Sequence, residues 1–182
     1  SSAASDVYKR QTDEDIIEAL ESVQLTGNRT EWKKAANGAD ILSDVYNANP
    51  TAMRLILQTF ASISTNPEGK KMAVLADMKE LGEDSVALHS QLIQQLSPDS
   101  IAQLVFYGDD IQELAQLASH LYPAGKVRFF PKNQQEDQFE AMQEHVQAIL
   151  NPSDQILLKG SNSMGLARLV DDLVGKKGEE SH

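Results

Sequence analysis

One short segment of the chain offers an unusual concentration of polar groups. DVYNANP, from Asp44 to Pro50, contains a carboxylate, a phenol and two carboxamides within six residues. Such a set could hold a sugar hydroxyl, an adenine edge or a peptide. The alternative is a turn in which Asn47 and Asn49 make local hydrogen bonds before a helix that starts at Pro50. The residues alone leave both interpretations open.

A second segment, LKGSNSM from Leu158 to Met164, combines a cation with turn-forming residues. Lys159 carries a full positive charge, and Gly160 permits a tight turn. Ser161 and Asn162 add side-chain donors, and the backbone N–H groups at the start of a following helix favour an anion. These features predict a site for a carboxylate or a phosphate. The alternative is a helix-capping loop with a solvated lysine.

Charged side chains occur in two further loops. LADMKELG, from Leu75 to Gly82, contains Asp77 and Glu80, which could bind magnesium, an amine or a basic substrate group. Carboxylates in such loops are more often solvated. Arg29, within TGNRTEW, could place its planar guanidinium on a phosphate, although a single arginine is weak evidence for such a site.

Several kinds of site are absent from the sequence. The histidines have no metal-ligand spacing, so we predict neither a metal site nor histidine-based catalysis. No Walker A or GxGxxG sequence is present, so the chain does not itself carry a recognised loop for ATP phosphates or a dinucleotide. The lack of cysteine excludes disulfides and thiolate metal sites and fits a reducing compartment.

Charge and hydropathy narrow the range of partners. The formal net charge of −11 argues against nucleic acid and against an anionic membrane surface, because both require a basic face. No apolar run approaches the roughly 20 residues that span a bilayer, and the N-terminus lacks a signal pattern. We expect a soluble, cytoplasmic monomer.

The centre of the chain alternates between short apolar runs and amphipathic stretches. The predicted strands cover residues 40–43, 71–76, 102–107, 127–130 and 155–158. The predicted helices cover residues 51–63, 85–96, 110–121, 135–150 and 163–174. This alternation predicts a Rossmann-like α/β domain, with a mainly parallel sheet and helices on both faces. Residues 1–11 (SSAASDVYKRQ) and 176–182 are polar and without periodicity, which indicates a non-native or disordered leader and a disordered tail.

Four segments in a fixed order resemble a known family. They are TGNRTEW, DVYNANPTAM, VLADMKELGEDSVALH and ILLKGSNSM, and they closely resemble the last third of the Mur ligases over residues 12–174. Sister branches of that family carry a histidine-containing version of the second segment. The paired asparagines Asn47 and Asn49 resemble instead the branch that adds D-alanyl-D-alanine. One departure is Ala76, where the family pattern has glycine.

The resemblance implies an activity in peptidoglycan synthesis. Mur ligases have a UDP-binding domain, a central ATPase domain with the phosphate loop, and a Rossmann-like C-terminal domain. By this likeness residues 12–38 are the end of the central domain and its linker, and residues 39–175 are the C-terminal domain. The expected cofactors are ATP and Mg²⁺, bound mainly by the central domain. The expected substrates, UDP-MurNAc-tripeptide and D-alanyl-D-alanine, are joined through an acyl phosphate.

The resemblance also implies roles for single residues. Catalytic roles are implied for Arg29, near the ATP phosphates, and for Lys159. Nucleotide contacts are implied for Arg29, Asp44, Tyr46 and Asn47. Substrate contacts are implied for Asn47, Asn49, Thr51, Lys159, Ser161 and Asn162. Without a phosphate loop, the chain alone is expected to be inactive.

Two other functions stay open on the residues alone. A signalling receiver domain is also a five-stranded α/β fold with acids at strand ends and a late lysine. It fits poorly, because Tyr107 and Gly108 stand where its phospho-accepting acid belongs and Gly160 replaces its proline. The second alternative is a stand-alone module that binds a nucleotide or a peptide.

Overall fold

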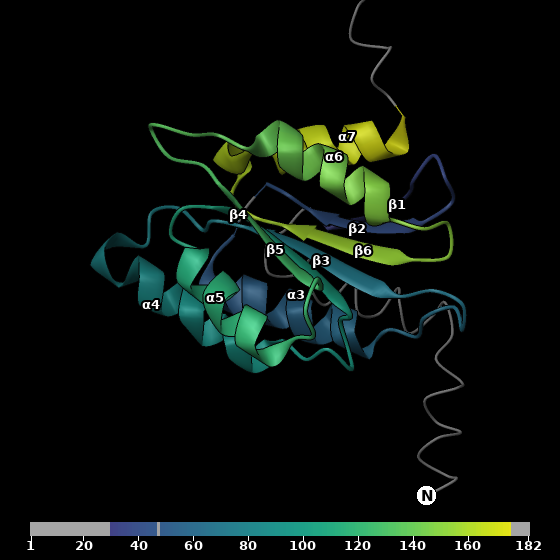
Figure 1. The fold of residues 1–182 in the computed structure, drawn as a ribbon, viewed down its shortest axis with the longest axis horizontal. Helices are drawn as coiled ribbons and strands as arrows, with labels where there is room; N and C mark the ends of the chain where they lie inside the picture. The colour runs from purple at the N-terminus through teal and green to yellow at the C-terminus, as the bar shows by residue number, and fades with distance from the viewer. Residues whose placement is uncertain (1–29, 47, 176–182) are drawn as a thin grey trace, which may run out of the picture.

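A six-stranded sheet forms the centre of the molecule in the computed structural model, which describes residues 30–46 and 48–175 (Figure 1). The strands are β1 (Glu31–Lys34), β2 (Asp40–Asp44), β3 (Lys71–Ala76), β4 (Gln103–Gly108), β5 (Val127–Pro131) and β6 (Gln155–Lys159). Their order is β1-β2-β6-β3-β4-β5. Every pair from β2 across to β5 is parallel, and β1 is antiparallel to β2. The predicted mainly parallel α/β fold is confirmed.

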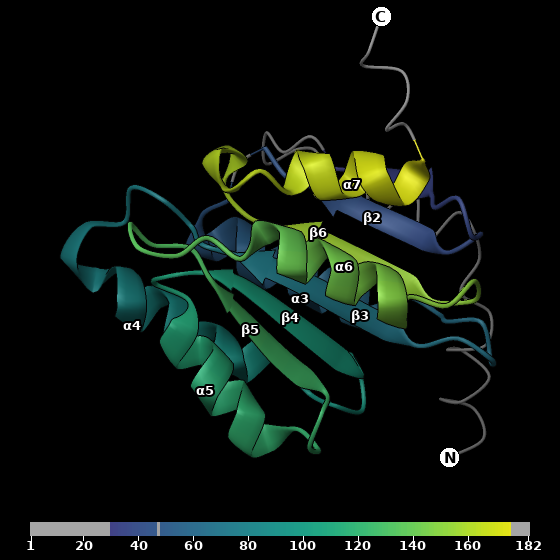
Figure 2. The same cartoon turned by 45° about the horizontal axis from the view of Figure 1, so that its top comes forward.

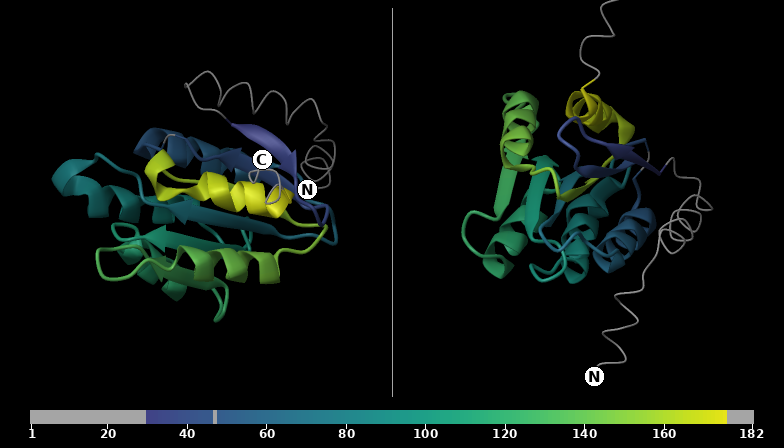
Figure 3. Two further views of the ribbon diagram at one scale, coloured as in Figure 1. Left: turned by 90° about the horizontal axis from the view of Figure 1, so that it is seen from above. Right: turned by 90° about the vertical axis from the view of Figure 1, so that its right-hand side faces the viewer.

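Helices cover both faces of this sheet (Figure 2). One face carries α3 (Pro50–Ser62), α4 (Ser85–Ser90) and α5 (Gln112–Leu121). The other carries α6 (Phe139–Ile149) and α7 (Leu166–Val174). The right-hand view of Figure 3 shows the resulting three layers. Such a doubly covered sheet explains why its central strands are apolar along their whole length.

Strand β3 illustrates the point, because every residue of KMAVLA is buried. Ala73 and Leu75 belong to the core beneath α3, α4 and α5. Met72, Val74 and Ala76 belong to the core beneath α6 and α7. Successive side chains of a strand point to opposite faces, so one apolar run supplies both cores.

The order of the strands creates a topological switch point at the carboxyl edge of the sheet. β6 is the last strand in the sequence, yet it lies between β2 and β3. The helix that follows β2 covers one face, and the helix that follows β6 covers the other (Figure 1). In open α/β sheets, ligands bind beyond the carboxyl ends of the strands at such a point. The ends of β2, β6 and β3 are therefore where a site is expected.

Strand β1 is the one element of the sheet that the sequence pattern does not predict. It is four residues long, polar in sequence (EWKK) and only partly buried. Its pairing with β2 brings Glu31 opposite Ser43 and Lys34 opposite Asp40. The described part of the segment 12–38 thus belongs to the sheet, while the assignment of that segment to a central domain and linker stays a prediction.

Two predicted helices differ from the observed ones. The predicted helix 85–96 is α4 followed by a 3₁₀ turn over Gln91–Gln95, and it ends just before Ser97 and Pro98, where proline cannot continue a helix. The predicted helix 135–150 starts only at Phe139. Asn133 Oδ1 accepts hydrogen bonds from the N–H groups of residues 135 and 136, and this local turn replaces the first helical turn.

Some predictions concern parts of the chain that are not described. Residues 1–29, Asn47 and 176–182 lie outside the described residues, so the leader, Arg29 and the tail are not tested. Among the helices of residues 30–46 and 48–175, none has the length and apolar character needed to cross a membrane.

Candidate functional site

The ends of β2 and β6 hold a buried ion pair. The sheet register places Asp44 beside Lys159, the last residues of the two strands. The Lys159 Nζ lies 2.8 Å from Asp44 Oδ2, and both side chains are 0% exposed. Burial lowers the pKa of Lys159, and the charge of Asp44 and the hydrogen bond to it oppose this shift. The lysine predicted to be a loop cation is thus part of the core.

Only one of the two Asp44 carboxylate oxygens accepts hydrogen bonds from the described residues. Thr30 Oγ1 donates to Oδ2 at 3.1 Å, the same oxygen that faces Lys159. The other oxygen, Oδ1, is buried and has no hydrogen-bond partner among the described residues. A buried acceptor without a donor costs about 1–3 kcal/mol. An O–H or N–H donor of a ligand would remove that cost. Asp44 is therefore the clearest candidate for a ligand-binding residue.

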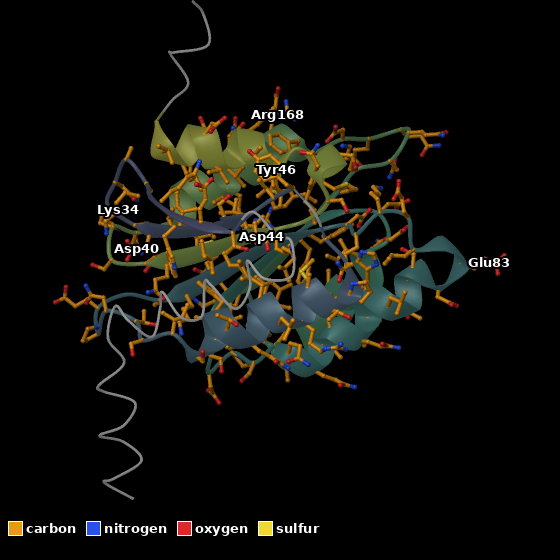
Figure 4. All side chains as sticks on the ribbon, turned by 180° about the vertical axis from the view of Figure 1, so that it is seen from behind. Lys34, Asp40, Asp44, Tyr46, Glu83 and Arg168 are labelled. Atoms are coloured by element: carbon orange, nitrogen blue, oxygen red, sulfur yellow. The ribbon has the colours of Figure 1, made fainter. Side chains whose placement is uncertain are left out.

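The DVYNANP loop leads directly from Asp44 into α3. Asn49 Oδ1 accepts a hydrogen bond from the Ala52 N–H at 2.8 Å, which makes Asn49 the N-cap residue before Pro50. This is the capping role that the sequence left open for Asn49, and it occupies the side-chain oxygen. Thr51 is exposed in the first helical turn, and Tyr46 is 44% exposed. Figure 4 shows Tyr46 beyond Asp44, on the side of the sheet covered by α7.

The two remaining loops, which the sequence presents as separate features, are joined in the structure. Ser161 Oγ accepts a hydrogen bond from the Lys79 N–H at 2.9 Å, and the Ser161 N–H donates to the Asp77 carbonyl at 3.1 Å. Between them the backbones pack tightly, because a Cβ on Gly160 would lie 2.6 Å from the Cβ of Ala76. These contacts hold Ser161 and the exposed Asn162 in place.

Asp77 has a structural role, not the ligand-binding one considered from its sequence. Its carboxylate is fully buried and accepts hydrogen bonds from the N–H groups of Asp109, Asp110 and Ile111 at 2.9, 3.3 and 3.0 Å. These bonds hold the loop between β4 and α5. The arrangement offers no open coordination site and no exposed phospho-acceptor. Glu80, by contrast, is exposed, in a left-handed conformation at φ 65°.

His89 is a buried residue whose importance the sequence does not reveal. Its Nε2 accepts a hydrogen bond from the Met78 N–H at 2.8 Å, so Nδ1 carries the proton and donates to the Ser85 carbonyl at 2.7 Å. Ser85 Oγ in turn donates to Asp110 Oδ2 at 2.6 Å. His89 thus fixes the loop after β3. The available signal is its place one helical turn after Ser85, on the inner side of α4.

The described residues include no group of three or more His, Cys, Asp or Glu side chains able to hold a metal ion. The candidate site consists of Asp44 and Lys159, the exposed residues Tyr46, Asn49 and Thr51 that follow β2, and the Ser161–Asn162 turn. It can accept hydrogen bonds from a polar ligand and donate to an anion. Arg29 and Asn47, which the resemblance places in the same site, lie outside the described residues.

Comparison with known proteins identifies the family of this chain. The family model "Mur ligase, glutamate ligase domain" matches residues 28–162. The UDP-N-acetylmuramoyl-tripeptide--D-alanyl-D-alanine ligase of Bacillus subtilis is 33% identical over 161 residues, which is 88% of this chain and 34% of that protein. The ligase of the same name from Mycobacterium tuberculosis is 29% identical over 163 residues, covering 82% of this chain and 31% of that protein.

A solved structure extends the comparison to the fold. The crystal structure of MurF from Acinetobacter baumannii superposes with a TM-score of 0.59 at 26% identity, over 81% of this chain and 30% of that one. The chain spans about a third of the length of the curated relatives that it matches. On the family match, which covers most of its residues, the chain belongs to the Mur ligase family.

Proposed function

We propose that this chain is the C-terminal domain of an ATP-dependent ligase that adds D-alanyl-D-alanine to UDP-MurNAc-tripeptide. The relatives that carry this name match the chain along most of its length. The DVYNANP loop, with its paired asparagines, resembles that branch of the family. In the whole protein the domain would form one wall of the active site. We further propose that this protein acts as a monomer in the cytoplasm, where ATP is available.

The observation that carries the proposal is the buried Asp44 Oδ1, which has no donor among the described residues. A ribose hydroxyl of ATP is an O–H donor of the required kind. The position also fits, because Asp44 ends a parallel strand at the switch point of the sheet. Asp44 would thus orient the nucleoside, and Lys159 would hold the Asp44 carboxylate in position.

The reaction would be an acyl transfer in two steps. The carboxylate of the tripeptide takes the γ-phosphoryl group of ATP, which releases ADP, and the amine of the dipeptide then attacks the acyl phosphate and displaces phosphate. ATP and Mg²⁺ would be bound mainly by a domain with a phosphate loop, and they supply the phosphoryl group and its charge neutralisation. This domain would contribute positioning and the exclusion of water when the domains close.

The other predicted residues divide between the two ligands. Tyr46 and Asn47 would line the nucleotide side, with Arg29 near the phosphates. Asn49 and Thr51 at the start of α3, and Ser161 and Asn162 beyond β6, would face the dipeptide. Lys159 is buried against Asp44. We therefore propose that it acts on the reaction by positioning Asp44.

The experiment compares the chain with a parent protein that includes the phosphate-loop domain. We expect the parent to release ADP from ATP only with both UDP-MurNAc-tripeptide and D-alanyl-D-alanine present, and the chain alone to release none. Asn47→Ala and Lys159→Ala in the parent should each lower ligation at least about 10-fold. Asn66→Ala is the matched control, because Asn66 forms a remote turn with Glu68. Full activity of both site variants would refute the site assignment.

A further inference from the structure

Two basic side chains lie at the edge of the sheet close to the Ser161–Asn162 turn, and neither belongs to the predicted site. Lys132 follows β5, and Arg168 lies in the first turn of α7. Lys132 Nζ donates to the carbonyl of Ser163 at 3.2 Å, so it reaches the turn after β6. The Arg168 side chain lies beside Gly165, the last residue of the same turn, because a Cβ on Gly165 would be 3.5 Å from Arg168 Nε. Both cations therefore flank one loop.

The Arg168 guanidinium stacks on an aromatic ring. Its guanidinium carbon lies 4.1 Å from the centroid of the Phe139 ring, at the start of α6. The residue is exposed, and no acidic side chain among the described residues forms a salt bridge with it. Figure 4 shows Arg168 on the outer side of α7, on the same face of the sheet as Tyr46. A stacked guanidinium loses little freedom when it binds an anion.

The two aromatic rings beneath these cations pack against each other. The Tyr107 and Phe139 rings meet edge to face at 5.5 Å, and Lys132 Nζ lies 5.8 Å from the centre of the Tyr107 ring. The nearby Asp137 carboxylate accepts through Oδ1 from the Tyr107 hydroxyl at 2.6 Å and from the Phe139 N–H at 3.0 Å. Burial, followed by the bond to Asp137, raises the pKa of Tyr107, so its hydroxyl stays a donor.

Helix orientation adds to the positive potential at this place. Both α6 and α7 begin here, at the carboxyl edge of the sheet (Figure 2). The N-terminus of a helix carries a partial positive charge and attracts anions. Lys159, the cation expected from the sequence to attract an anion, is buried and neutralised by Asp44. In a chain with a net charge of −11, Arg168 and Lys132 are thus two cations close to the turn after β6.

We propose that Arg168, assisted by Lys132, binds the terminal carboxylate of the incoming dipeptide. This inference rests on the proposed function. The dipeptide reacts through its amine, so its own carboxylate must be held away from the phosphoryl group. A planar guanidinium pairs with a carboxylate through two parallel hydrogen bonds, which also sets the direction of the bound molecule. The turn from Ser161 to Gly165 adjoins both cations and would contact the rest of the dipeptide.

The test compares D-alanyl-D-alanine with its C-terminal amide as substrates of the parent protein. The amide keeps the amine and lacks the negative charge. We expect the unaltered protein to prefer the acid, and Arg168→Gln to reduce kcat/KM for the acid about 10- to 100-fold. The same substitution should change kcat/KM for the amide and KM for ATP about 2-fold at most. Arg168→Lys, which keeps the charge, should recover part of the preference for the acid.

Arg128→Gln is a matched control. Arg128 is likewise exposed and stacked on a phenylalanine, with its guanidinium carbon 5.2 Å from the Phe130 ring, but it lies near the start of β5. It should leave the preference for the acid unchanged. Equal losses for acid and amide in Arg168→Gln would show a structural role and refute the carboxylate assignment alone. A parent that ligates neither substrate would refute the proposed function as well.

Discussion

Asp44 and Asp77 are two fully buried aspartates at the carboxyl edge of the sheet. Asp44 ends β2 and Asp77 follows β3, and β6 lies between these two strands. Asp77 accepts three backbone N–H groups and uses both carboxylate oxygens. Asp44 uses Oδ2 for Lys159 and Thr30, and its Oδ1 has no donor among the described residues. The two residues are alike in type, burial and position, and differ in how completely the fold satisfies them.

The difference separates the structural role of Asp77 from the binding role that we propose for Asp44. The three backbone bonds of Asp77 come from one loop of the same domain, and Lys79 Nζ also donates to Oδ2 at 3.4 Å. Asp77 therefore stabilises that loop and has little capacity left. The glycine beside it supports this interpretation, because a Cβ on Gly108 would lie 2.2 Å from Asp77 Oδ1. Asp44 Oδ1 carries a cost that no donor among the described residues removes. Whether a buried carboxylate binds a ligand is therefore better predicted from its oxygen atoms that lack a donor than from its burial.

The largest expected effect is on stability, at Asp77. Asp77→Ala would leave three N–H groups without their acceptor, so we expect the free energy of unfolding to fall by about 3 kcal/mol or more. Asp77→Asn keeps one acceptor oxygen and should lose less. Urea unfolding of the chain, followed by circular dichroism, measures both. Asp99→Ala, at an exposed aspartate, is the control and should change stability by about 0.5 kcal/mol at most.

A second prediction concerns the ion pair of Asp44. Lys159→Met leaves a buried carboxylate without its cation and should cost about 3 kcal/mol. Adding Asp44→Asn removes the charge that was left, so the double variant should regain most of this stability. In the parent protein, the double variant should nevertheless bind ATP more weakly than the unaltered protein. A double variant as unstable as the single one would show that the pair does not act as proposed.

The sequence predicts the fold well because the strands of a doubly covered sheet are continuous apolar runs. The run KMAVLA is recognisable without any knowledge of its neighbours. Strand β1 is not predicted, because EWKK is short and polar and becomes a strand only by pairing with β2. The order of the strands does not follow from periodicity either, since periodicity is a local property.

The candidate site is predicted only in part, for the same reason. The polar loops after β2 and β6 are visible in the sequence as DVYNANP and LKGSNSM. That Lys159 would be buried against Asp44 depends on β6 lying next to β2. The role of Arg168 depends on α6 and α7 starting side by side, which brings the guanidinium onto Phe139. Contacts between segments distant in the chain need the tertiary structure.

A third buried charge, Lys71, lies at the opposite end of β3 from Asp77 and extends the comparison to a cation. Its side chain is buried, at 6% exposure for the residue, and no carboxylate among the described residues pairs with it. Its ammonium donates to the carbonyls of Ala61 and Ile63 at the end of α3. Burial lowers the pKa of Lys71 to about 8. The fold thus satisfies its hydrogen bonds while leaving its charge uncompensated.

The smallest expected effect is a pH dependence of stability due to Lys71. The folded chain holds this proton less tightly than the unfolded chain, whose lysine pKa is 10.5. Unfolding therefore takes up a proton between pH 8 and 10.5, and the free energy of unfolding contributed by Lys71 rises with pH in that window. We expect about 2 kcal/mol, because the two carbonyls favour the ammonium and offset part of the burial. We would measure urea unfolding at pH 7.5 and at pH 10. The free energy of unfolding of the unaltered chain should rise between these two pH values by the contribution of Lys71, and Lys71→Met should lack that contribution. The same pH gradient in both proteins would show that Lys71 keeps its proton, and that carbonyl acceptors alone can stabilise a buried charge.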